Sequence, residues 1–134
     1  MQIIVFTLKD KYYAMSTDKV EEISKKIPST KVPNSPIWIE GLINLRGYVV
    51  TLVNLSKLLH QDDGVCYNNI IIIHNNDEKI GLMVKAVKEV MNIKADDIQR
   101  IEDKGSDGII GIVRINGDII NIIDIVKLLS KNEG

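Results

Sequence analysis

The side chains of this sequence with the greatest capacity for chemistry are two histidines, His60 and His74, and one cysteine, Cys66. A structural zinc site needs four ligands at short spacing, whereas the histidines are fourteen residues apart and have no cysteine at ligand spacing. Nothing beside Cys66 suggests a histidine that would activate it as a nucleophile. The acidic pairs Glu21–Glu22 and Asp62–Asp63 are sequence neighbours, so we expect solvated surface. We therefore predict no catalytic residue, no metal site, no cofactor and no enzymatic activity.

The charge balance limits the class of partner. The 134 residues carry 17 Lys and Arg against 18 Asp and Glu, and include one Phe, one Trp and four Tyr. Nucleic-acid-binding domains normally show a basic excess and stacking aromatics, so we predict no nucleic-acid partner. A small nucleic-acid-binding barrel stays as the alternative from another functional class.

Several features indicate the compartment. A single cysteine allows no internal disulfide and is typical of a reducing environment. The N-terminus lacks the features of a signal peptide, and uninterrupted apolar runs reach only four residues. We expect a cytoplasmic protein that does not insert directly into a membrane.

The elements that must position any site are predicted to be strands. Ile, Val and Leu supply 24, 12 and 10 residues, and the β-branched Ile and Val favour strands. Short apolar runs separated by turn residues predict strands over 2–8, 11–15, 70–75 and 79–84. Many short strands with few helices are typical of small barrels.

An internal repeat organises these elements. Residues 41–59 align with 111–129 at an offset of 70 without a gap, with five identical positions, and residues 14–23 align more weakly with 81–90. Two copies are too few for a solenoid. We predict a single mainly β domain, residues 1–134, made of two small barrels related by duplication and joined near 60–69.

Each strong copy predicts the same local structure. A hairpin turns at Arg46–Gly47 or Asn116–Gly117, because a tight turn with positive φ favours these glycines and the asparagine. Asn54 or Asp124 then caps a short helix. A third cap pattern, Ser35–Pro36, predicts a short helix that runs through Ile39 and ends at Gly41.

Arg46 stands out because the sister copy places Asn116 at the same turn position, and asparagine suits that backbone better. Three explanations remain open from the residues alone. The two turns differ in type, or Arg46 pairs with a surface acid, or it presents a forked donor to a partner. Similarly, the proline-rich segment 27–38 is either an edge protected against aggregation or a preformed docking edge.

Over its whole length, the sequence resembles the CheW-type coupling proteins of bacterial chemotaxis. The most specific part is a P-x-x-I-x-G-x-x-N-L-R-G core. The stretches that carry the resemblance are VFTL at 5–8, YAM at 13–15, VEEI at 20–23, VPNSPIWIEGLINLRG at 32–47, NLSKLL at 54–59 and IGLMV at 80–84.

The resemblance implies two small five-stranded β-barrels and a non-enzymatic adaptor, a monomer when isolated, that is recruited to membrane receptor arrays. Such proteins bridge the cytoplasmic tips of methyl-accepting chemoreceptors and the regulatory domain of the histidine kinase CheA. Receptor coupling involves the residues that match Arg46, Gly41, Val20 and Glu22. Kinase binding is carried over only as a region.

That kinase-facing region comprises Ile23, Thr30, Val32 and Pro33. The sequence departs from the family at Lys85, where an acid is usual. A coupling protein of a related non-flagellar pathway, such as twitching or gliding, is the nearest alternative.

Overall fold

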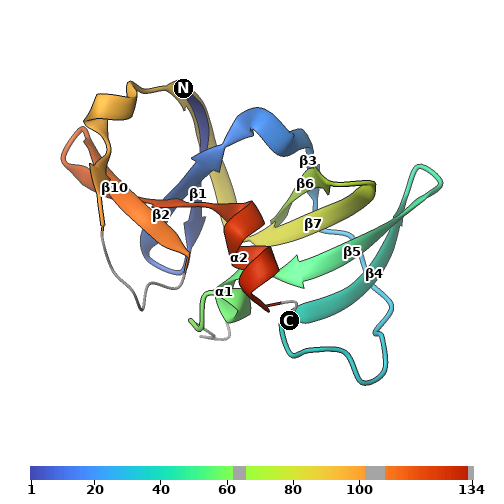
Figure 1. The fold of residues 1–134 in the computed structure, drawn as a ribbon. Coiled ribbons are helices and arrows are strands. Elements are labelled where there is room, and N and C mark those ends of the chain that lie inside the picture. The colour runs from blue at the N-terminus through green and yellow to red at the C-terminus, as the bar shows by residue number, and fades with distance from the viewer. Residues whose placement is uncertain (62–65, 102–107, 133–134) are drawn as a thin grey trace. The chain divides into compact units, whose positions relative to one another are not determined.

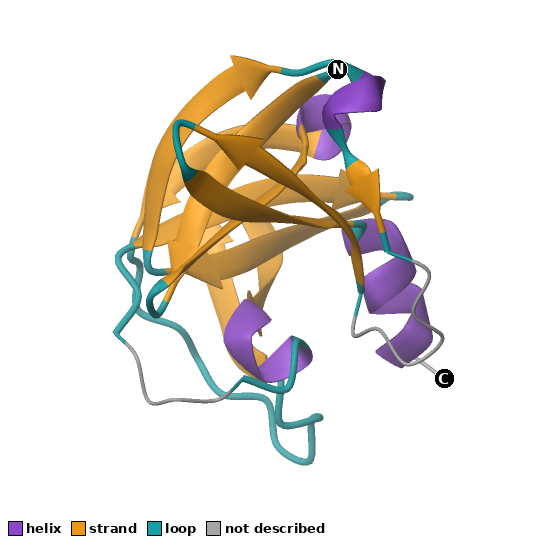
Figure 2. Ribbon diagram, turned by 90° about the vertical axis from the view of Figure 1, so that its left-hand side faces the viewer, coloured by secondary structure: helices purple, strands orange, loops and turns teal. Residues whose placement is uncertain are grey.

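The computed structural model describes residues 1–61, 66–101 and 108–132, and these are mainly β, as predicted (Figure 1; Figure 2). The strands are β1 (Gln2–Leu8), β2 (Lys11–Ser16), β3 (Val20–Lys25), β4 (Ile39–Leu45), β5 (Tyr48–Asn54), β6 (Asn69–Asn75), β7 (Glu78–Val84), β8 (Ala86–Asn92), β9 (Gln99–Arg100), β10 (Ile109–Ile115) and β11 (Asp118–Ile123). The α-helices are α1 (Leu55–Leu58) and α2 (Ile125–Asn132), and single 3₁₀ turns cover Thr17–Lys19 and Ala95–Asp97. No helix in the described part of the chain has the length and apolar character needed to cross a membrane.

The chain divides into two compact units. Unit 1 comprises Met1–Asp18 with Val87–Gly134, and unit 2 comprises Lys19–Ala86. The sheet of unit 1 has the strand order β8-β1-β2-β11-β10-β9, and that of unit 2 has the order β3-β6-β7-β5-β4. The sixth strand of unit 1 is the two-residue β9, so the expectation of five principal strands is met in each unit. Within the described residues, each sheet has two end strands that do not pair with each other. The units are therefore barrel-like sheets that are not closed.

The two copies of the repeat exchange strands between these sheets. By sequence offset, β1 to β5 correspond to β6, β7, β8, β10 and β11. Unit 1 combines β1 and β2 of the first copy with β8, β10 and β11 of the second, and unit 2 has the reverse combination. The parallel pairs β5–β7 and β11–β2 have the same register. Thr51 lies opposite Ile80 in unit 2, and the matching residues Asn121 and Tyr13 lie opposite each other in unit 1.

This exchange moves the boundary away from where the sequence placed it. The predicted joint near 60–69 lies inside unit 2, between α1 and β6, whereas the chain passes between units at Asp18–Lys19 and Ala86–Val87. Sequence similarity identifies copies, and here a copy is not a unit, because non-local strand pairing decides which segments fold together.

The buried cores of the units use matching positions. Each core takes residues from the hairpin of one copy and from the first strand of the other. Hairpin positions Ile43, Val50 and Leu52 in unit 2 correspond to Val113, Ile120 and Ile122 in unit 1, and all six are buried.

The local signals of the repeat are confirmed. Arg46 and Gly47 have φ of 52° and 86°, and Asn116 and Gly117 have 51° and 86°, as a turn with two left-handed central residues requires. The side chain of Asn54 accepts a hydrogen bond from the Lys57 backbone N–H at 3.1 Å, which caps α1. In the second copy, Asp124 accepts one from the Lys127 N–H at 3.0 Å.

The short helix predicted from Ser35–Pro36 is wrong. The Ile39 N–H donates to the Pro36 carbonyl at 3.0 Å in a single turn, and β4 then begins at Ile39. The Ser35 hydroxyl donates to the Val32 carbonyl at 2.8 Å and caps nothing. The pairing of β4 with β5 outweighs the local helix signal.

Candidate protein-interaction site

Arg46 forms an ion pair with Glu22, in which the guanidinium Nη2 donates to the carboxylate Oε2. This pairing with a surface acid is one of the three explanations offered for Arg46. A second, a difference in turn type, is wrong, because the two turns have nearly the same φ values. The Arg46 side chain is nevertheless 71% exposed, compared with 27% for Glu22. Its remaining N–H groups are thus accessible to a partner.

The ion pair links strands from the two ends of the unit 2 sheet. Glu22 lies on β3 and Arg46 lies in the β4–β5 turn, and β3 and β4 are the end strands. An exposed pair contributes only about 0–1 kcal/mol to stability. Its main effect is to fix the orientation of Arg46 relative to β3.

A second ion pair lies beside the first. Glu21 accepts a hydrogen bond from the Lys79 ammonium, and its other oxygen is 3.5 Å from His74 Nδ1. The Lys79 ammonium also lies 4.7 Å from the centre of the Tyr48 ring. Lys79 lowers the pKa of the Glu21 carboxyl, and Glu21 in turn raises the pKa of Lys79.

A β-bulge explains why two adjacent glutamates both find cations. The register of β3 against β6 shifts between Val20 and Glu22, which leaves Glu21 as the extra residue. Glu21 and Glu22 were expected to be solvated surface, and no role was predicted for His74, Lys79 or Tyr48. The pairing of His74 opposite Lys79 in the β6–β7 hairpin was the available signal, but the bulge was not readable. We name as the Arg46 rim the residues Glu21, Glu22, Arg46, Tyr48, His74 and Lys79.

Gly41 occupies a different environment. It is buried, and a Cβ built on it would lie 2.4 Å from the Thr30 carbonyl oxygen. Thr30 and Leu42 exchange two backbone hydrogen bonds of 2.9 and 2.8 Å at this point. Gly41 is thus the residue that lets the segment around Thr30 approach β4. Val20, the fourth residue of the receptor group, is half-buried on β3 beside Glu22.

The expected kinase-facing residues lie along both end strands of unit 2. Ile23 is 43% exposed on β3, and Thr30 and Pro33 are exposed in the arm that leads to β4. Val32 is half-buried, and its carbonyl accepts the Ser35 hydroxyl. Val49, which was not predicted as a site residue, is 65% exposed next to Tyr48 on β5. Exposed apolar side chains beside charged ones are typical of a protein-binding surface.

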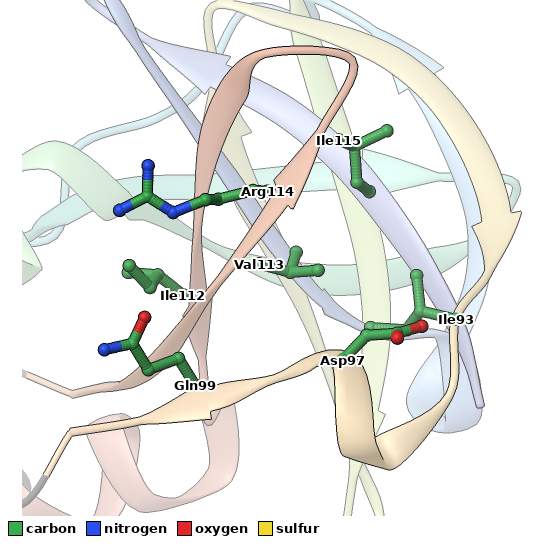
Figure 3. A pocket seen from close by; sticks show the side chains of 7 residues that line it. All are labelled: Ile93, Asp97, Gln99, Ile112, Val113, Arg114 and Ile115. Carbon is green, nitrogen blue, oxygen red and sulfur yellow. The ribbon is translucent and has the colours of Figure 1, made fainter.

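A cleft of about 330 Å³ lies in unit 1, between the segment around Ala95–Asp97 and β10 (Figure 3). Its lining mixes apolar side chains with Asp97, Gln99 and Arg114, and Figure 3 shows the Arg114 side chain extending away from Asp97. One carboxylate oxygen of Asp97 accepts the Lys94 N–H at 3.0 Å, which is a structural role. Over the described residues no group of three or more His, Cys, Asp or Glu side chains is placed to hold a metal ion.

Comparison with known proteins decides the family. The sequence profile described as CheW-like domain matches residues 2–133. The chain belongs to the CheW family. Chemotaxis protein CheW of Thermotoga maritima is 29% identical over 137 residues, covering 97% of this chain and 88% of that protein. Chemotaxis protein CheW of Bacillus subtilis is 32% identical over 136 residues, covering 97% and 87%.

A solved CheW structure has the same fold. The crystal structure of scaffolding protein TtCheW from Thermoanaerobacter tengcongensis matches with a TM-score of 0.86 and 32% identity, covering 99% of this chain and 90% of that chain. The resemblance drawn from the sequence is therefore confirmed. As a CheW-type protein, the chain is a scaffold of bacterial chemotaxis signalling.

Proposed function

We propose that this protein couples the cytoplasmic tips of chemoreceptors to the regulatory domain of the histidine kinase CheA, as a cytoplasmic adaptor without enzymatic activity. The observation that carries the proposal is an arginine held in place yet largely exposed. Arg46 is fixed by Glu22 but remains 71% exposed, which is the state expected of a donor preorganised for a partner.

The receptor contact consists of Arg46 and Glu22 with Val20 beside them on β3. An arginine fork suits the carboxylates and backbone carbonyls at the end of a helical hairpin. Gly41 contributes indirectly, because its lack of a side chain allows the Thr30 segment to pack on β4. The kinase contact consists of Ile23 and the Thr30–Pro33 arm.

The mechanism is bridging of two weak contacts. Within a receptor array, each contact raises the effective concentration of the other, so neither needs high affinity alone. The receptor state then biases the kinase by a coupling free energy of about 1–3 kcal/mol. An isolated monomer serves this role, since the bridge needs only one copy.

The test is Arg46→Ala in a reconstituted system of receptor fragments, CheA and this protein. We expect receptor-dependent kinase activation to fall, while the free energy of unfolding changes by less than about 0.5 kcal/mol, as is usual for an exposed site. Arg114→Ala is the matched control, because Arg114 is exposed on β10 of unit 1. Activation by Arg46→Ala equal to that of the control would remove Arg46 from the receptor contact.

A further inference from the structure

Unit 1 has a counterpart of the Arg46 rim. The offset of 67 that relates β3 to β8 places Glu89 at the position of Glu22, and the offset of 70 places Asn116 at the position of Arg46. Both hairpin turns have the same φ values, so the two positions are equivalent in backbone conformation as well. In unit 2 the glutamate binds an arginine of its own chain, whereas in unit 1 the matching residue is an asparagine.

A cavity of about 180 Å³ lies at this place in unit 1. That is roughly six times the volume of a water molecule in the liquid, which is room for a guanidinium group. The cavity lies between β8 and the β10–β11 turn, with apolar side chains at its base. Its lining is formed by Val5, Tyr12, Lys88, Glu89, Met91, Ile115, Asn116, Asp118 and Ile120.

The polar groups of this cavity have an excess of negative charge. Glu89 and Asp118 are two carboxylates against the single ammonium of Lys88. In the Arg46 rim, by contrast, Glu21 and Glu22 are balanced by Arg46 and Lys79. None of the three charged side chains at the unit 1 cavity has a hydrogen-bond or ion-pair partner within the described residues.

The surroundings of the cavity are apolar. Val90 is 48% exposed on β8, and Ile119 is 47% exposed on β11. They correspond to Ile23 and Val49 of unit 2, which are also exposed. A charged recess bordered by exposed apolar side chains is the arrangement of a protein interface and not that of a small-molecule pocket.

We propose that this cavity receives an arginine side chain from a protein partner, which takes the place that Arg46 occupies within unit 2. The guanidinium binds Glu89 and Asp118, and its flat face lies against Tyr12. Arginine fits better than lysine because it is planar, forked and less strongly hydrated. The proposal does not depend on the receptor and kinase assignments above.

The first experiment titrates blocked arginine, N-acetyl-arginine N-methylamide, into the whole protein and follows backbone amide shifts by NMR. We expect saturable shifts at Glu89, Asn116 and Gly117, and about fivefold weaker binding for Glu89→Gln and for the blocked lysine analogue. Asn116→Arg should abolish the shifts by filling the cavity from within. Arg46 in the matching turn shows that this backbone accepts an arginine.

The matched variant in unit 2 is Arg46→Asn, which gives the Arg46 rim the turn residue of unit 1. It should add a second set of shifts around Glu22 and Gly47. Unchanged binding to Asn116→Arg, or equal binding of the lysine analogue, would overturn the proposal.

A second probe separates a protein partner from a free guanidinium compound. The blocked tripeptide Leu-Arg-Leu should bind more tightly than blocked arginine, and Ile119→Ser should remove that gain without affecting blocked arginine. If the tripeptide binds no more tightly, the cavity is a small-molecule site and the assignment to a protein partner is wrong.

Discussion

The two units have the same hairpin turn beside an end strand but carry different side chains there. In unit 2, the turn arginine pairs with the end strand, and the neighbouring Glu21 pairs with Lys79. In unit 1, the turn residue is Asn116 and the matching space is a cavity of about 180 Å³. Backbone, register and core are repeated between them, but the charges are not. The duplication has thus kept the buried positions that fold and changed several of the charged residues around the hairpin turn.

The largest effect tests whether the two cores are equivalent. Leu52→Ala and Ile122→Ala remove matching buried side chains, each 0% exposed, so each should cost about 2–5 kcal/mol of unfolding free energy. Urea unfolding of both variants measures this. A cost for one variant several times that of the other would show that the two cores are not energetically alike.

The second largest effect on stability is expected at two glycines that match between the copies, Gly41 and Gly111. A Cβ on Gly41 would lie 2.4 Å from the Thr30 carbonyl oxygen, and one on Gly111 would lie 2.8 Å from the Gln99 carbonyl oxygen. Both contacts are with backbone, which yields less readily than a side chain. We expect Gly41→Ala to cost about 1–3 kcal/mol and Gly111→Ala less.

Thermal or urea unfolding ranks the two glycine variants, and amide shifts of Thr30 and Gln99 report the local displacement. The reverse order of stability would contradict the close approach of Thr30.

The smallest effect concerns the pH dependence of the Glu21–Lys79 pair. The pKa of Glu21 is lowered in the folded state, so its stabilising contribution is present above its unfolded pKa and is lost as pH falls through the folded value. The pKa of Lys79 is raised, so its contribution is present below its unfolded pKa and is lost as pH rises through the folded value. The coupling should therefore be fullest between these limits, near neutral pH.

A double-mutant cycle with Glu21→Gln and Lys79→Met isolates this coupling. It should fall when the pH is lowered into the acid range and when salt is added, since both side chains are near the surface. A coupling that does not change from neutral to acid pH would contradict the ion pair.

Local features of the fold were predictable because a few adjacent residues determine them. The Asn116–Gly117 turn and the Asn54 and Asp124 caps follow from backbone and side-chain geometry within four residues. The helix signal at Ser35–Pro36 was equally local, but the pairing of β4 with β5 outweighed it. The exchange of strands between copies was not predictable, because it depends on contacts between segments far apart in the chain.

The candidate site shows the same division. Comparison of the two copies identified Arg46, since a turn position that favours asparagine holds an arginine. The sequence did not identify which acid it meets. The second ion pair depends on a β-bulge at Glu21, which shifts the strand register by one residue and leaves no mark in the sequence.

The strand exchange also sets an order of events during synthesis. Unit 2 is one continuous stretch, so it can fold as soon as Ala86 has left the ribosome. The β1–β2 hairpin is synthesised before β11, the strand that pairs with β2 in the finished sheet. At about 5–20 residues per second, that hairpin has an unpaired edge for roughly 5–20 seconds while the intervening hundred or so residues are translated. The exposed edge of β2 in that hairpin therefore needs protection from aggregation while the chain is being made.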